Sequence, residues 1–149
     1  MNFLYRVISY IVLALLLASV IAISINHQTF YKSTFFLGMG LGLWFFGDYK
    51  MLQIDKYYNY SFFIAILFLG YGLLIKQFIN INLDLVDLGS YYPLSLLLVQ
   101  KPLRLIFKQT LNREPVIDKP PPTFWDGVYT ILLFLAFAVL PFIIMDNLK

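Results

Sequence analysis

The sequence predicts an all-α, polytopic membrane protein: a transmembrane bundle of five spans, with an additional amphipathic helix on the cytoplasmic side. Of its 149 residues, 60% are apolar and only 13% are charged, whereas about a quarter of the residues in a soluble domain carry charge. Its mean hydropathy is +0.77. The apolar residues form runs close to the ~20 residues that cross a bilayer, so a single membrane domain, residues 1–149, is expected.

The first span is expected at about residues 3–25. Its apolar run follows Arg6 as in a signal peptide, but it exceeds the roughly 7 to 15 residues of a signal core, so we expect it to be retained. The other four spans are expected at about residues 31–47, 59–75, 84–100 and 127–145.

The span at residues 84–100 is the weakest of the five, because only residues 88–100 are free of charge. Apolar and polar residues alternate over residues 78–85, so a short strand or extended loop is an alternative there. Without a span at residues 84–100, the protein would have four spans.

The distribution of basic residues predicts the orientation, since short cytoplasmic connections carry an excess of lysine and arginine. Four spans would place seven of the eleven basic residues on one side, and five spans place eight there. These eight are Arg6, Lys50, Lys56, Lys101, Arg104, Lys108, Arg113 and Lys119. We therefore expect the N-terminus inside, the C-terminus outside and, under either count, residues 101–126 in the cytoplasm. The membrane is expected to be a bacterial inner membrane, with an organellar membrane as the alternative.

The first half of the segment 101–126 is predicted to be a basic amphipathic helix over residues 102–111. Its apolar side is Leu103, Ile106, Phe107 and Leu111, and its basic side is Lys101, Arg104 and Lys108. Such a helix lies in the membrane interface with its cations toward anionic lipid headgroups. A sharper alternative is that Arg104, Lys108 and Arg113 bind a phosphorylated or lipid-linked substrate.

The second half of the segment alternates in charge and is stiffened by Pro120, Pro121 and Pro122 before Trp125. We expect an ordered loop that caps the bundle or binds another subunit. The predicted partner-binding or anionic-lipid-binding residues of the whole segment are Lys101, Arg104, Lys108, Arg113, Glu114, Asp118, Trp125 and Asp126.

The carboxylates in and near this segment could have roles other than binding a partner or lipid. Glu114 and Asp118 could act as a general acid and base or hold a divalent cation, although no nucleophile or metal-ligand spacing accompanies them. Asp48 and Asp126 each border a span, where they could pair with Lys50 or Arg113, although helix capping is the commoner role.

A possible ion path is formed by Asn80, Asp84, Asp87 and Tyr91, whose spacing places them on one helical face. Carboxylates at membrane depth are costly and indicate a proton or cation path. The alternative is that both aspartates face water at the edge of the apolar run.

Glycines predict where helices pack. Gly38 and Gly42 form a GxxxG pair, and Gly70 lies in another span. Small residues at such positions let the backbone of a neighbouring helix approach closely.

The chain contains no cysteine and a single histidine, His27. Disulfides, thiolate catalysis and iron–sulfur ligation by this chain are therefore excluded, and zinc or haem held by this chain alone is disfavoured. We expect no metal and no cofactor.

The leading hypothesis for function is a non-catalytic accessory or scaffold subunit of a larger membrane protein assembly. Its expected partners are the lipid bilayer, other membrane subunits and anionic headgroups, and not nucleic acid. The first alternative is a small transporter, or an ion- or proton-conducting protein, that uses Asp84 and Asp87. A weaker one is a membrane enzyme acting on a lipid-linked phosphate substrate.

Overall fold

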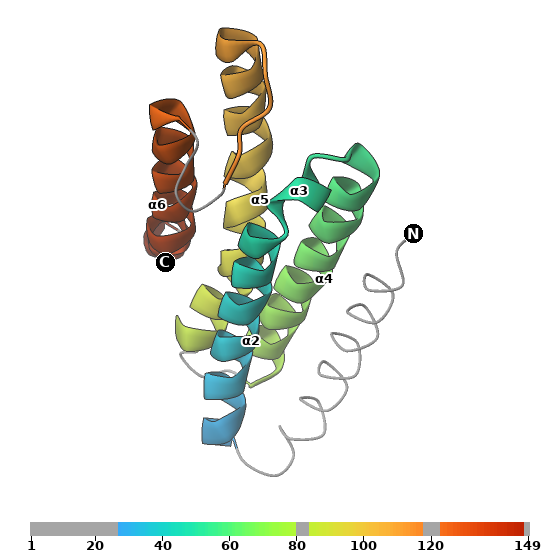
Figure 1. Cartoon of the computed structure of the whole chain (residues 1–149). Coiled ribbons are helices and arrows are strands. Elements are labelled where there is room, and N and C mark those ends of the chain that lie inside the picture. Colours follow the sequence, from blue (N-terminus) through green and yellow to red (C-terminus); the bar gives the residue numbers. More distant parts are fainter. Residues whose placement is uncertain (1–26, 80–83, 118–122, 148–149) are drawn as a thin grey trace.

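The described part of the chain is a bundle of four long α-helices and one short one. The computed structural model describes residues 27–79, 84–117 and 123–147. Its helices are α2 (His27–Gly47), α3 (Tyr49–Leu52), α4 (Asp55–Ile79), α5 (Asp84–Leu111) and α6 (Phe124–Asn147) (Figure 1). No strand occurs in these ranges, so the all-α prediction is confirmed for them. The first predicted span, residues 3–25, lies outside the described residues.

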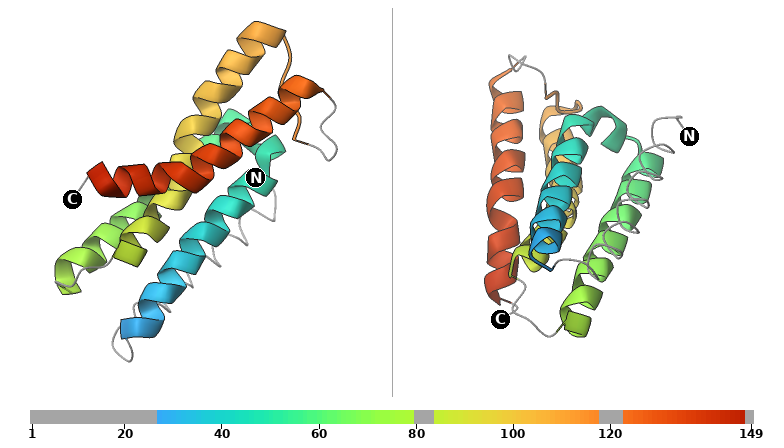
Figure 2. Two further views of the ribbon diagram at one scale, coloured as in Figure 1. Left: turned by 90° about the vertical axis from the view of Figure 1, so that its left-hand side faces the viewer. Right: turned by 90° about the horizontal axis from the view of Figure 1, so that it is seen from below.

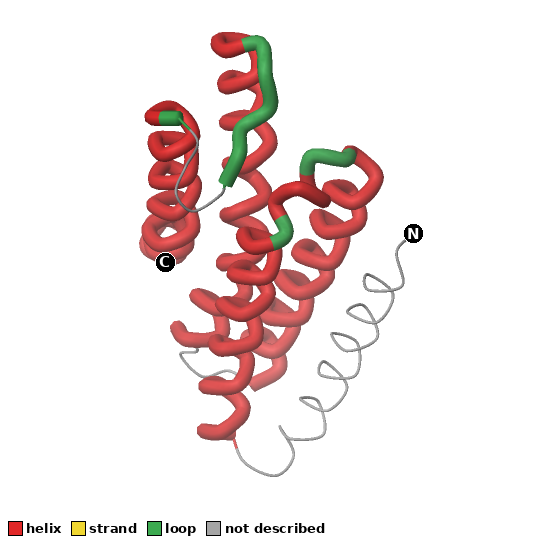
Figure 3. The backbone as a smooth tube through the Cα atoms, viewed as in Figure 1, coloured by secondary structure: helices red, strands yellow, loops and turns green. Residues whose placement is uncertain are grey.

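The four long helices alternate in direction along the bundle (Figure 1). The described non-helical segments lie toward one end of the bundle and are shown in green in Figure 3. We call this end of the bundle, together with the helical turns that border it, the loop end. It comprises residues 48–54, 101–117 and 123–126. The helix predicted at about residues 31–47 begins earlier in the structure, because α2 already starts at His27. Continuing the helix keeps its backbone groups hydrogen-bonded within the segment.

Helix α5 is the centre of the bundle and packs against α2, α4 and α6 (Figure 2). Its middle turns are buried on almost every side, including Leu88, Tyr92, Leu96 and Leu97. The same turns also bury two small polar residues, Ser90 and Ser95. The core therefore follows the axis of α5.

Two glycines allow α2 and α5 to touch backbone to backbone. A methyl group on Gly38 would overlap the carbonyl oxygen of Gly89 in α5. That carbonyl cannot receive the usual helical hydrogen bond, because the residue four positions later is Pro93, which has no N–H. A methyl group on Gly89 would lie 2.7 Å from the Cα of Phe35. Close contact of this kind needs glycine on both helices.

The other predicted packing glycines differ in their surroundings. A methyl group on Gly42 would overlap the ring of Phe137 in α6. Gly38 and Gly42 are therefore covered by helices of this same chain and not by a partner. A methyl group on Gly70 would have no described atom within 4 Å, so the described helices do not pack closely against it.

The structure corrects the predicted boundary at residue 101. The amphipathic stretch 102–111 is not a separate helix lying in the interface, because α5 runs from Asp84 to Leu111 through Pro93 and Pro102. Proline is tolerated inside a helix where neighbours satisfy the freed backbone groups. Near Pro102, Tyr58 of α4 donates a hydrogen bond of 2.8 Å to the carbonyl of Leu97. At 1.5 Å per residue, α5 is about 42 Å long.

Two of the described helices are long and apolar enough to cross a membrane, Asp55–Leu74 within α4 and Phe124–Asn147. Thr34–Gly47 is apolar but shorter. Their length and composition weakly suggest association with a membrane, because core helices of soluble proteins can have the same length and composition.

Candidate functional site

The segment after α5 turns back along the helix it has just left. Asn112 has φ of 52°, the left-handed conformation that often ends a helix and that asparagine adopts more readily than most residues. Its N–H still bonds the carbonyl of Lys108 at 2.9 Å. This reversal places Glu114 beside Arg104, which is ten positions earlier in the chain.

The first polar group formed by this reversal centres on Glu114. Arg104 donates from Nε to Glu114 Oε2 at 2.7 Å and from Nη2 to Oε1 at 2.9 Å. Lys108 Nζ lies 3.0 Å from the same Oε1. The hydrogen bond from Arg104, helped by Lys108, lowers the pKa of Glu114 from 4.5 to about 2, and the same hydrogen bond raises the pKa of Arg104.

The second polar group, which we call the clasp, consists of Arg113, Val116, Thr123 and Asp126. The Asp126 carboxylate is fully buried. It accepts from Arg113 Nη1 at 3.0 Å and Nη2 at 2.8 Å, from the N–H of Val116 at 3.0 Å and from the Thr123 hydroxyl. Arg113 also donates to the Thr123 hydroxyl oxygen at 2.7 Å. A buried charge is tolerated when it is paired and hydrogen-bonded on this scale.

The clasp and the Glu114 group are linked to the rest of the loop end. The Pro115 ring is fully buried, and its carbonyl accepts a hydrogen bond of 3.0 Å from Gln53, between α3 and α4. On α5, Lys101 lies 3.6 Å from Asp55 at the start of α4. Segment 112–117 therefore joins α5, α6 and the turn before α4.

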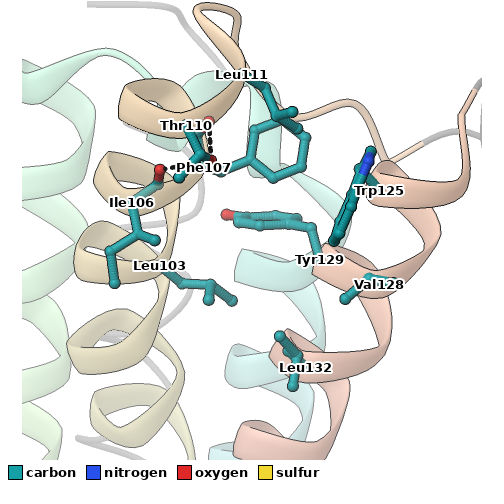
Figure 4. A pocket seen from close by; sticks show the side chains of 9 residues that line it. All are labelled: Leu103, Ile106, Phe107, Thr110, Leu111, Trp125, Val128, Tyr129 and Leu132. Atoms are coloured by element: carbon teal, nitrogen blue, oxygen red, sulfur yellow. Dashed lines mark hydrogen bonds between the residues drawn. The ribbon is translucent and has the colours of Figure 1, made fainter.

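An apolar groove of about 300 Å³ lies between α5 and α6 on the outer side of this region (Figure 4). It is lined by Leu103, Ile106, Phe107, Thr110, Leu111, Trp125, Val128, Tyr129 and Leu132. The Thr110 hydroxyl contributes little polarity, because it bonds the carbonyls of Ile106 and Phe107 at 3.0 and 3.1 Å. The rings of Phe107 and Tyr129 meet edge to face, with centroids 5.5 Å apart.

The groove and the clasp share Phe107. The Arg113 guanidinium carbon lies 5.2 Å from the centroid of the Phe107 ring, a geometry in which a cation is attracted to an aromatic face. The side chain that forms part of the groove is thus held in place by the same arginine that ties α5 to α6.

Five of the eight predicted partner-binding residues, Arg104, Lys108, Arg113, Glu114 and Asp126, lie in these two polar groups. Lys101 pairs with Asp55 instead, and Trp125 lines the groove. Asp118 lies outside the described residues. The carboxylate of Glu114 is held by Arg104 and Lys108, so nothing described supports the acid–base role considered for it.

The predicted ion path is described only in part. Asn80 lies outside the described residues; Asp84 begins α5, and Asp87 falls in its first turn. Tyr91 is buried. The alternative strand over residues 78–85 is not formed where the chain is described, since α4 continues to Ile79 and α5 starts at Asp84.

Apart from Trp125, sequence reasoning did not identify the groove residues of α6, and it did not identify the role of Thr123. Thr123 precedes α6, and Asp126 follows three residues later, which is the spacing of a capping box. The N–H of Asp126 bonds the Thr123 hydroxyl at 3.3 Å, so this signal was present in the sequence. At the other predicted cap, the Asp48 side chain makes no capping hydrogen bond, and its Oδ2 is buried without a partner among the described residues.

The described residues include no group of three histidine, cysteine, aspartate or glutamate side chains able to hold a metal ion. Comparison with known proteins adds no assignment: no family model, no curated protein and no solved structure matches this chain.

Proposed function

We propose that the protein is a non-catalytic integral membrane subunit that docks onto a partner membrane protein through the groove between α5 and α6. Membrane insertion is supported by the large apolar side chains exposed along α4 and α6. On α6 they are Ile131, Leu132, Phe134, Leu135, Val139, Phe142 and Ile143. A surface this apolar is rare on soluble monomers and indicates contact with lipid or another protein.

The groove is the observation that carries the docking proposal. An engineered cavity of about 150 Å³ holds one benzene molecule, so about 300 Å³ accommodates one or two large apolar side chains from a partner helix. Trp125 and Tyr129 line it, and tryptophan and tyrosine are the residue types that most often dominate the energy of protein interfaces. Phe124 and Ile106 beside them are well exposed.

The polar residues of the loop end support binding over catalysis. Arg113 and Asp126 satisfy each other, and Glu114 is held by two cations. The Arg113 guanidinium already binds an internal carboxylate, so it is poorly placed to bind a phosphate substrate. This weakens the enzyme alternative. Rigid, internally paired groups instead present one fixed surface, which lowers the entropy cost of association.

The proposal is tested by filling the groove. The full chain, tagged, is solubilised from its native membranes, and the amount of co-purifying protein is measured for wild type, Leu132→Trp and Ile131→Trp. Leu132 lines the groove, whereas Ile131 is an exposed residue of α6 outside it. We expect wild type and Ile131→Trp to retain the same partner and Leu132→Trp to lose it at least tenfold. Equal retention by both variants, or a wild type that purifies alone as a stable monomer, would overturn the proposal.

A second candidate is the transporter or ion-conducting protein predicted from Asp84 and Asp87. It is supported by buried polar side chains along α5, namely Ser90, Ser95 and Gln100. The Oε1 atom of Gln100 and the hydroxyl of Ser61 in α4 have no partner among the described residues. Flux in reconstituted vesicles that survives the double substitution Asp84→Asn and Asp87→Asn would remove this candidate.

A further inference from the structure

The last turns of α5 present a face that differs from the groove face. Lys101, Leu105 and Lys108 are four and three residues apart, so they lie on one side of the helix. We call this the lysine face. The Lys101 side chain is 38% exposed, Leu105 is 49% exposed and the Lys108 side chain is 56% exposed.

Positive charge is in excess on and beside the lysine face. Glu114 is the common partner of Arg104 and Lys108, so one carboxylate faces two cations. Asp55 lies 3.6 Å from Lys101, but its side chain is 78% exposed, and a pair this open to solvent is weak. Lys56 next to it is also exposed. This region therefore has four cations, on Lys56, Lys101, Arg104 and Lys108, and two carboxylates, on Asp55 and Glu114.

The structure separates the basic residues of this region into two kinds. The Arg104 side chain is only 14% exposed, and it forms two hydrogen bonds to Glu114. Arg113 is committed to Asp126 and Thr123. Lys108, in contrast, makes a single hydrogen bond among the described residues, and an ammonium group has three donors. The Lys108 ammonium can therefore offer donors to a ligand without breaking the internal network. The Lys101 ammonium lies 3.6 Å from Asp55 and 4.7 Å from the centroid of the Tyr58 ring, so it is shared with α4.

The lysine face begins where the predicted span 84–100 ends, on the same continuous helix. Long lysine side chains at such a position extend to the polar layer of a membrane. We propose that the lysine face binds the headgroups of anionic phospholipids through Lys101 and Lys108. This inference rests on the membrane insertion in the proposed function.

The test measures binding of dansyl-labelled phosphatidylglycerol to the full chain in mixed micelles, by energy transfer from Trp44 and Trp125. The same lipid with a choline headgroup is the zwitterionic control. Each lysine near an anionic surface contributes about 1 kcal/mol, which is about fivefold in affinity. We expect about a fivefold loss for Lys101→Gln or Lys108→Gln, about a 25-fold loss for the double variant, and retention by Lys101→Arg and Lys108→Arg.

Two further outcomes make the test decisive. Unchanged phosphatidylglycerol affinity in the double glutamine variant, or equal binding of both lipids by wild type, overturns the inference. Tighter binding of a polyglutamate peptide than of phosphatidylglycerol also overturns it, in favour of an acidic protein partner.

Failure of the proposed function is recognised separately. Wild type that is extracted from native membranes by alkaline carbonate is not inserted, and both proposals then fail. Wild type that resists carbonate but does not select phosphatidylglycerol removes the lipid inference alone.

Discussion

Arg113, in the segment that follows α5, and Asp126, in the first turn of α6, form a two-pronged ion pair with N–O distances of 3.0 and 2.8 Å. The carboxylate is fully buried, and it also accepts hydrogen bonds from Val116 and Thr123. The pair fixes the first turn of α6 against segment 112–117. Arg113 also contacts the ring of Phe107, which lines the groove. It joins the two helices that form the candidate docking site.

Replacing Asp126 by alanine should destabilise the protein, because it leaves the Val116 N–H and the Arg113 guanidinium, whose side chain is 37% exposed, without their acceptor. We expect a loss of about 2 kcal/mol in the free energy of unfolding, measured by denaturant unfolding in detergent. Thr123→Ala removes the cap, one of the four hydrogen bonds to the carboxylate and the bond from Arg113, and should cost less, about 1 kcal/mol. Equal effects of the two substitutions would contradict this description of the clasp.

Acid should weaken the contact between segment 112–117 and α5. The folded state lowers the pKa of Glu114 from 4.5 to about 2, so its ionised form stabilises folding fully above about pH 4.5. That contribution is lost as the pH falls from about 4.5 toward 2. Melting temperatures measured from pH 2 to 7 for wild type and Glu114→Gln should differ most above pH 4.5 and converge near pH 2. A difference independent of pH would show that the ion pairs contribute nothing.

Gly38→Ala and Gly89→Ala should each force α2 and α5 apart, since an added methyl group meets backbone atoms of the other helix. Overpacking of this kind costs about 1 to 3 kcal/mol. Gly40→Ala and Gly70→Ala are the matched controls, because the added methyl has no described atom within 4 Å; they should be neutral or stabilising by up to about 1 kcal/mol. Thermal unfolding in detergent of the four variants provides the measurement.

The two ends of the chain should lie on opposite sides of the membrane, as five spans require. Reporter fusions at residue 1 and residue 149 in the intact protein test this directly. A signal from the same side at both ends would favour four spans and would exclude the proposed path of residues 84–100 across the bilayer.

The sequence anticipated some parts of the site and missed others for identifiable reasons. Arg113 was a candidate partner of Asp126 because Asp126 borders a predicted span on the side where residues 101–126 were expected. The groove was not foreseen, because Phe107 and Tyr129 come from helices whose relative position no local pattern encodes. The end of α5 was misplaced because the charge of Lys101 and the proline that follows it, Pro102, were interpreted as the boundary between the span and the cytoplasmic segment. Instead, α5 continues to Leu111 in contact with α4 and α6.

The sequence by itself determined the class of this protein: long apolar runs must form helices, because only internal hydrogen bonds satisfy the backbone where water is scarce. Tertiary structure alone decided which charges are used internally and which are offered outward. The left-handed turn at Asn112 brings Glu114 back to Arg104 and Lys108, and the approach of α6 buries Asp126 under Arg113. A pairing set by the path of the chain through space depends on long-range packing, so it cannot be deduced from the spacing of residues along the sequence.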